Sequence, residues 1–292
     1  MQLSELITYF NQRFKDEHRF TDELLEYHQG QVEGRFGDTR LTAEFQPVRL
    51  AGTPSLVVGH DAVLKAVIRP NPGNSSENPT EKVFSGTADG APVVNLDRFS
   101  RTLILLNYLP IAGDGPLFLH VHPRHILSVK SGHGAYFEDI LARCGLSPQQ
   151  VVISLLLTPV YGHQLVRLLD GLRNYRNHGY ATAIKFDENS DHKFLERYCI
   201  EFLYRFTPDY VRFDTAFFKQ PWSKVAVWRS NPHLGKNITH LVSVLHELDT
   251  QFLLEGCHSK KDTLLAKHLS ADLIKGDYYD RSEVRTDRKA AG

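Results

Sequence analysis

The sequence predicts an α/β fold in which eight strands and the helices between them close into a (β/α)8 barrel. Two observations carry this prediction. From residue 41 onward, short apolar segments of strand length alternate with segments of helical periodicity. Eight such strands over about 240 residues fit a closed barrel better than an open sheet. The expected strands are 42–48, 56–65, 117–121, 151–157, 181–186, 210–213, 251–254 and 272–274.

The helices expected between these strands are defined by apolar side chains that recur every three or four residues. They span 96–109, 135–144, 161–178, 191–206, 236–249 and 261–269. Residues 69–90 have no such period and are rich in Pro, Gly, Asn and Ser, so they are expected to form a long loop.

The first forty residues differ from the barrel and are expected to form a helical extension. The apolar positions that predict its first helix are Leu3, Leu6, Ile7, Phe10 and Phe14. A second helix is expected around Leu24, Leu25 and His28. The chain is therefore divided into an extension, 1–40, a barrel, 41–280, and a flexible tail, 281–292. The apolar stripe of the extension must be buried against the barrel, a second copy or a partner, and we expect the functional surface to include it.

Composition narrows the compartment and the partners. Lys and Arg together number 34, as do Asp and Glu, so no global field favours nucleic acid or an acidic membrane. The three cysteines are widely spaced and form no CxxC pair, which suits a reducing cytosol. The sequence contains no secretory signal and no apolar run of 18 residues. We therefore expect a cytoplasmic protein with no nucleic-acid or membrane partner.

Three histidines lie close together in the segment LFLHVHPRHI, residues 117–126. His120 and His122 would share one face of an extended strand, as a metal-binding HxH pair does. Such a pair after an early barrel strand is similar to the metal centre of amidohydrolases, although no later expected strand ends in a histidine. His125 is expected to cap a helix or to face solvent.

Six fragments in one order carry a second resemblance. They are EFQPV (44–48), VGHDAVLK (58–65), LFLHVHP (117–123), PDYVRFD (208–214), LLEGCHSKKD (253–262) and LIKGDYYD (273–280). Their order and spacing resemble the EAL family of bacterial cyclic diguanylate phosphodiesterases and their inactive relatives. The resemblance covers about residues 42–280 and implies a barrel of the EAL type.

The resemblance also implies a metal centre against which this sequence can be compared. Active members hydrolyse a phosphodiester with two divalent cations, which carboxylates and an asparagine hold at the carboxyl ends of the strands. Hard cations such as Mg²⁺ need oxygen ligands. The first motif glutamate corresponds here to Asp61, and the asparagine corresponds to His120. The two glutamates of the LEITE motif correspond to Ser154 and Leu157.

Later motifs depart further from the family pattern. The paired aspartates of the DDFG motif correspond to Lys185 and Phe186, although a slip of one or two residues would offer Asp187 and Glu188 instead. The motif lysine becomes Arg212. The remaining positions that correspond to family motifs are Asp214, Glu255 and Lys275.

Two further positions concern the ligand. Gln46 is retained from the family's QPI motif, and Lys65 replaces the arginine of its YEALLR segment, which loses the bidentate contact with phosphate. The expected ligand-binding remnant therefore comprises Gln46, Asp61, Lys65, His120, Lys185, Arg212, Asp214, Glu255 and Lys275.

These substitutions predict a protein that has lost phosphodiesterase activity and needs no metal or other cofactor. Its expected role is regulation in bacterial signalling through contacts with an unidentified protein partner, and a homodimer is left open. One alternative is a cyclic diguanylate receptor that binds weakly without hydrolysis. A second alternative is a metal-dependent hydrolase that uses His120 and His122.

Overall fold

A closed barrel is the centre of the computed structural model, which describes residues 2–18, 24–36, 39–67, 83–186, 200–219 and 241–280. The strands are β1 Leu25–His28, β2 Gln31–Phe36, β3 Thr39–Leu50, β4 Thr53–Val67, β5 Leu117–Val121, β6 Val151–Leu157, β7 Ala181–Phe186, β8 Tyr210–Asp214, β9 Gln251–Glu255 and β10 Leu273–Lys275. Neighbours follow the order β1-β2-β3-β10-β9-β8-β7-β6-β5-β4, and β3 also pairs with β4. That last pairing closes β3 to β10 into a ring of eight strands, which confirms the predicted barrel.

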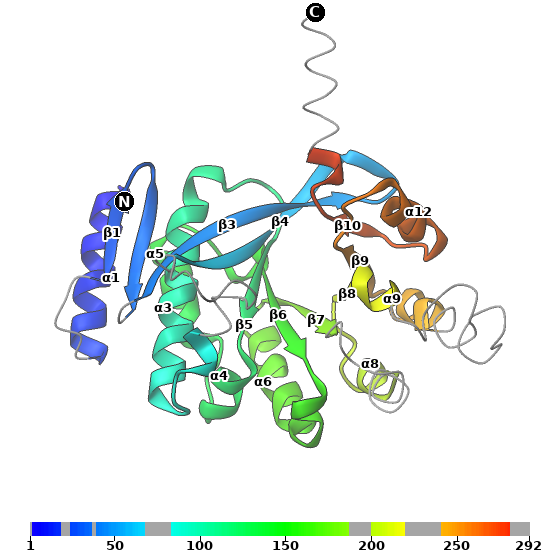
Figure 1. The fold of residues 1–292 in the computed structure, drawn as a ribbon. Helices are drawn as coiled ribbons and strands as arrows, with labels where there is room; N and C mark the ends of the chain where they lie inside the picture. Colours follow the sequence, from blue (N-terminus) through cyan, green and yellow to red (C-terminus); the bar gives the residue numbers. More distant parts are fainter. Residues whose placement is uncertain are drawn as a thin grey trace, which may run out of the picture.

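The barrel is parallel except at β3. This strand pairs antiparallel with both β4 and β10, whereas the pairs from β4 to β10 are parallel. Figure 1 shows β3 and β4 as a long ribbon that runs from the N-terminal elements at one end to β10 and α12 at the other. Parallel neighbours bring the carboxyl ends of their strands to one mouth, where side chains from distant parts of the sequence meet.

Helices cover the outside of the barrel. They are α1 Leu3–His18, α3 Ala91–Tyr108, α4 Pro123–Ser128, α5 Ala135–Arg143, α6 Leu165–Asn177, α8 Ile200–Phe206, α9 Thr215–Lys219 and α12 Lys260–His268. Short 3-10 helices are η1 Leu109–Ile111, η2 Pro148–Gln150 and η3 Pro159–Gln164. The expected loop 69–90 is described only from residue 83 onward, and the expected tail 281–292 lies outside the described residues.

The second helix expected in the N-terminal extension is wrong, because its residues form a β-hairpin. β1 and β2 pair antiparallel, with His28 opposite Gln31. Between them, Gln29 and Gly30 have φ angles of 48° and 89°. Two consecutive residues with positive φ form the tight turn whose twist suits a two-residue hairpin. Within its described residues, the extension therefore consists of the helix α1 and a hairpin that continues the sheet at β3.

The apolar stripe of α1 is buried against its own chain. Leu6, Phe10 and Phe14 are at most 2% exposed, and the rings of Phe14 and Phe99 lie 5.5 Å apart in an edge contact. Phe99 belongs to α3, which packs on the barrel. Of the three ways in which this stripe could be buried, the structure therefore shows packing on the rest of the chain. Among the described residues, no helix is both long and apolar enough to cross a membrane.

Candidate functional site at the barrel mouth

Strand alternation divides the barrel interior into an apolar layer and a polar layer. Phe118, Val152, Ala183, Leu253 and Leu273 pack together in the apolar layer with Val48. Residues two positions further along a strand point to the same side, one layer nearer the mouth. The side chains that this rule places in the polar layer are His120, Ser154, Lys185, Glu255 and Lys275, together with Asp61 from β4 and Arg212 from β8.

Arg212 is the centre of this polar layer. Its guanidinium is fully buried and contacts the carboxylates of Asp61 and Glu255. Nη2 donates to Asp61 Oδ2 at 2.8 Å, Nε donates to Glu255 Oε1, and Nη1 donates to Ser154 Oγ at 2.9 Å. A planar guanidinium with several fixed donors can satisfy carboxylates on two sides at once. Arg212 therefore joins β4, β6 and β9 through one side chain.

Two lysines complete the network. Lys275 Nζ lies 2.9 Å from Glu255 Oε2 and also pairs with Asp61 Oδ2. Lys185 Nζ lies 3.0 Å from the same Glu255 oxygen. Lys275 is 9% exposed at its side chain and Lys185 is 25% exposed, so Lys185 lies nearer to solvent. The two carboxylates thus face three cationic side chains.

Electrostatics keeps these groups charged. Burial alone would raise the pKa values of Asp61 and Glu255, but the charges of Arg212 and Lys275 outweigh it and hold both pKa values below the usual range. Burial would lower the pKa of Lys275, yet the two carboxylates raise it. Two negative and three positive charges give the layer a net charge of +1 at pH 7. The mouth is therefore locally basic, as the sequence predicts.

The histidines of the HxH segment have separate partners. His120 Nε2 lies 3.4 Å from Asp61 Oδ1, and partial burial lowers the pKa of its ring below 6.5. His122 instead caps α4: its Nδ1 accepts from Arg124 N at 3.2 Å, and its ring stacks on Phe84 with centroids 4.8 Å apart. Two imidazoles engaged in this way do not share a metal, which argues against the HxH centre.

The expectation that His125 caps a helix or faces solvent is wrong. Its side chain is 2% exposed, and Nδ1 lies 3.2 Å from Asp97 Oδ2. Arg101 lies 2.6 Å from the same oxygen and donates to Tyr175 Oη at 3.3 Å. Asp97 Oδ1 also accepts from the main-chain N–H of His122. We call Asp97, Arg101, His125 and Tyr175 the helix cluster, because α3, α4 and α6 supply them.

The donor set of the polar layer does not fit a pair of divalent cations. Hard cations need several free anionic oxygens at close range. Here both oxygens of Glu255 contact cations, Asp61 Oδ2 contacts two cations, and Asp61 Oδ1 faces His120. Within the described part of the chain, no three His, Cys, Asp or Glu residues are grouped to hold a metal ion.

The remaining expected site residues lie outside this network. Gln46 lies opposite Asp61 in the β3–β4 ladder, half-buried. Lys65 is 45% exposed at its side chain and lies 3.3 Å from Glu44. Asp214 is the last residue of β8. Its Oδ1 accepts a hydrogen bond from Ala216 N at 2.7 Å, at the start of α9. Asp187 and Glu188 lie outside the described residues. The sequence brought Ser154 forward only as a lost ligand and missed its role as a hydrogen-bond acceptor for Arg212.

Comparison with solved structures shows which fold this barrel has. One match is the EAL enzyme Bd1971 in its form bound to cAMP and cyclic-di-GMP, with a TM-score of 0.60, 15% identity, and coverage of 95% of this chain and 65% of that one. A second match is Klebsiella pneumoniae BlrP1 in a calcium and cyclic-di-GMP complex. Its TM-score is 0.62 at 19% identity, and the match covers 81% of this chain and 54% of that one. A third match is a standalone EAL protein from Vibrio cholerae in its c-di-GMP-bound form. Its TM-score is 0.56 at 16% identity, and the match covers 82% of this chain and 91% of that one.

These likenesses establish that the chain has the EAL-type barrel fold. The chain spans less than two thirds of the first two of these proteins. No family model matches the sequence, and no curated protein matches it.

Proposed function

We propose that the chain is a non-catalytic EAL-like regulatory protein of bacterial signalling that acts through protein–protein contacts. One observation carries the loss of catalysis: the buried guanidinium of Arg212 lies between the carboxylates of Asp61 and Glu255. By the family resemblance, these carboxylates correspond to groups that hold divalent cations. In this chain, side-chain cations that belong to the protein take their place.

The chemistry of two-metal hydrolysis supports this proposal. Such hydrolysis needs paired cations that activate a water and stabilise the departing oxygen. Arg212 and Lys275 carry positive charge but cannot lower the pKa of a water as a divalent cation does. Lys185 adds a further positive charge at a position that corresponds to a family aspartate. Bringing a divalent ion into a layer of net charge +1 would also be opposed by Coulomb repulsion.

The role in protein contacts rests on what the chain retains. Its barrel is complete, and its N-terminal helix and hairpin pack firmly on that barrel. A scaffold that keeps its core while its own cationic side chains pair with the carboxylates at its centre suits recognition rather than hydrolysis. The partner is an unidentified protein, and a homodimer is the other arrangement that the proposal allows.

The test of catalysis is a direct assay. The purified 292-residue chain is incubated with cyclic diguanylate and Mg²⁺ or Mn²⁺, beside an active EAL phosphodiesterase as positive control. We expect no linear dinucleotide above the level given by Glu255→Ala. A turnover that Glu255→Ala abolishes would overturn the proposal, because it would require Glu255 to leave Arg212 and hold a metal.

A cyclic diguanylate receptor is the second candidate, and the exposure of Lys185 and His120 favours it. Their side chains are 25% and 38% exposed in a layer of net positive charge, so a phosphate could approach them. Selective binding also needs partners for each base. We expect a dissociation constant no better than about 10 μM, or about −7 kcal/mol. Calorimetry with the dinucleotide tests this, and a submicromolar constant lost in Lys65→Ala or Lys185→Ala would establish the receptor instead.

A further inference from the structure

The outer edge of β1 presents main-chain groups to a groove beside α1. His28 and Gln31 form the pair that closes the two-residue turn, so β1 residues alternate from there. Glu26 and His28 direct their N–H and C=O groups towards β2, and Leu25 and Tyr27 direct theirs to the outer edge. An edge of this kind is a template for another strand.

An asparagine side chain already uses half of this edge. Asn11 Oδ1 accepts from Leu25 N at 2.9 Å, and Asn11 Nδ2 donates to Leu25 O at 2.8 Å. The carboxamide thus makes the two bonds that a residue of a neighbouring strand would make. Asn107 does the same for Val32 on β2, with both distances 2.8 Å. The hairpin therefore accepts a strand-like partner on each side.

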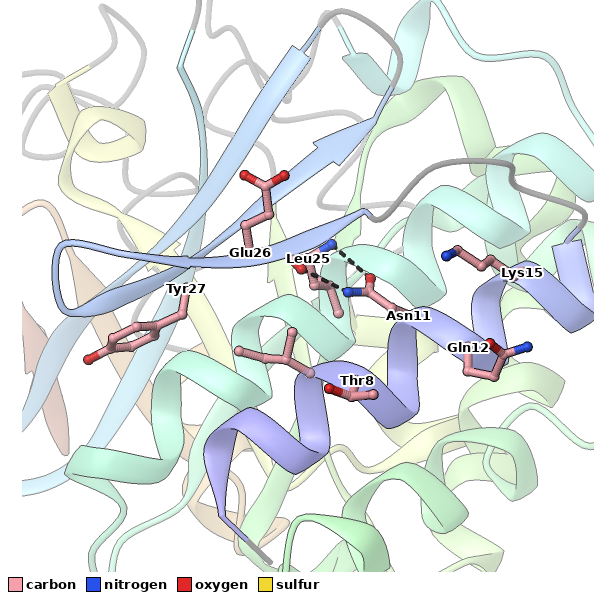
Figure 2. Close-up of a pocket in the computed structure, with 8 residues that line it drawn as sticks. Thr8, Asn11, Gln12, Lys15, Leu25, Glu26 and Tyr27 are labelled. Atoms are coloured by element: carbon pink, nitrogen blue, oxygen red, sulfur yellow. Dashed lines mark hydrogen bonds between the residues drawn. The ribbon is translucent and has the colours of Figure 1, made fainter.

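Tyr27 is the next edge position, and its outward main-chain groups have no hydrogen-bond partner among the described residues. Tyr27 is 59% exposed. A groove of about 480 Å³ lies here, lined from α1 by Ile7, Thr8, Gln12 and Lys15 and from β1 by Glu26 and Tyr27. Figure 2 shows Asn11 reaching from α1 to Leu25, with Tyr27 further along the same strand.

We propose that this groove binds an extended peptide segment of a partner protein, which adds to β1 as a short strand paired with Tyr27. The proposal deepens the proposed function, because it rests on a role in protein contacts and names their form. Strand addition draws its affinity from main-chain hydrogen bonds and its specificity from side chains on either face. Ile7 offers an apolar contact for such a segment, and Lys15 and Glu26 offer one charge of each sign.

Other occupants fit the groove less well. A helix has already used its main-chain groups internally and cannot pair with a strand edge. Glu26 in the lining and a chain with no net charge disfavour nucleic acid. A second copy paired through four-residue β1 strands would bury far less than the roughly 800 Å² per partner that a stable dimer needs. An extended peptide needs only the short edge that is present.

The experiment uses random seven-residue peptides displayed on phage, selected on the immobilised 292-residue chain. Enriched peptides are then synthesised and titrated against three proteins: the wild type, Tyr27→Ala and Tyr27→Pro. Tyr27→Pro removes an outward N–H that β2 does not use, and proline is tolerated on sheet edges. Tyr27→Ala removes the ring and keeps the N–H. Equal melting temperatures of the three proteins show that each is folded.

We expect enriched peptides to bind wild type and Tyr27→Ala within a few-fold and to lose about tenfold or more on Tyr27→Pro. Binding should also slow hydrogen exchange at the Tyr27 amide in the wild type. No enrichment over the uncoated support, or equal binding to Tyr27→Pro, would overturn the proposal. Dimerisation that Tyr27→Pro abolishes would replace the peptide by a second copy. Cyclic diguanylate hydrolysis would sink the non-catalytic role while leaving the peptide result to stand by itself.

Discussion

Two buried arginines in this molecule make contrasting ion-pair clusters. Arg212 lies inside the barrel and joins carboxylates from β4 and β9, with Asp61 lying 151 residues away in the sequence. Arg101 lies outside the barrel in the helix cluster, and its carboxylate partner, Asp97, is one turn away on the same helix. Both guanidinium groups are at most 2% exposed.

The two clusters differ in the sequence distance to the partners of each arginine and in the solvent exposure of the surrounding side chains. The helix cluster sets one carboxylate against one arginine, with the near-fully buried His125 and Tyr175 beside them, so it only joins α3, α4 and α6. The Arg212 network collects side chains from strands whose carboxyl ends meet at the mouth, and it keeps Lys185 and His120 partly exposed. Burial of an arginine is thus no sign of function by itself. The long-range origin of its partners instead places the Arg212 network at the mouth of the barrel, where strands from distant parts of the sequence meet.

Removal of Arg212 should have the largest effect. Arg212→Ala leaves Asp61 and Glu255 buried with one near cation fewer on each, and breaking such a buried network costs ~3–5 kcal/mol. We expect the free energy of unfolding, measured in urea, to fall by that amount. The control is Lys65→Ala, which breaks the exposed ion pair with Glu44. This variant should change the free energy of unfolding by less than about 1 kcal/mol. A loss of under about 1 kcal/mol in Arg212→Ala would mean that the network relaxes with little strain.

Substitutions in the apolar stripe of α1 show how much stability is lost when a buried contact without ion pairs is broken. Leu6→Glu combined with Phe10→Glu places two carboxylates where the wild-type side chains are at most 2% exposed. We expect the free energy of unfolding to fall by ~2–4 kcal/mol, as for an unpaired charge in a core. The control is Thr8→Glu, on the exposed face of the same helix. A double variant that melts like the wild type but loses its partner or its dimer would show instead that this stripe is an interface.

Mild acid should act first on His125 of the helix cluster, and this is the smallest of the three expected effects on stability. Burial lowers the pKa of His125 from 6.5 to about 3. A group with a lowered folded pKa stabilises the fold above its unfolded pKa, and this stability is lost as the pH falls. The free energy of unfolding should therefore drop by about 2 kcal/mol between pH 7 and pH 5 on account of His125. Asp61 and Glu255, and Asp97 of the helix cluster, also have lowered pKa values and act only below their ordinary values of 3.8 for aspartate and 4.5 for glutamate.

Urea titrations at several pH values measure this pH dependence. His125→Gln removes the titrating group, and it should flatten the slope between pH 7 and pH 5 and leave the steeper loss below about pH 4.5. A slope that persists unchanged in His125→Gln would assign the acid sensitivity to another histidine, of which the half-exposed His120 is the first to examine.

The sequence predicted most of the barrel because its strands are distinctive. β5, β6 and β7 begin and end at the expected residues, since each is an apolar run bounded by turn or helix signals. The hairpin at 25–36 was missed because Leu24, Leu25 and His28 are also spaced as in a helix. Its main signal, the Gln29–Gly30 turn, is weak without the more usual Asn or Asp.

The sequence predicted that several polar residues lie together, but not how they pair. The order of motifs placed Asp61, Arg212, Glu255 and Lys275 near one mouth, and the structure brings them together. The pairing of Asp61 Oδ2 and both Glu255 oxygens with cations depends on the register between β4, β8, β9 and β10, which no local pattern contains. The same limit applies to Lys65, whose contact with Glu44 follows from the β3–β4 ladder.

The antiparallel strand β3 has a consequence for the order of folding. Its pairing with β4 is a local hairpin, whereas its pairing with β10 joins distant ends of the chain. Loop closure over such a separation is slow, so the β3–β10 contact is expected late on the folding pathway. Asp61 and Lys275, 214 residues apart in sequence, can meet only when that closure occurs. The Asp61–Lys275 contact therefore forms as the barrel closes. Since it forms late, we expect it to lower the unfolding rate and to have little effect on the folding rate.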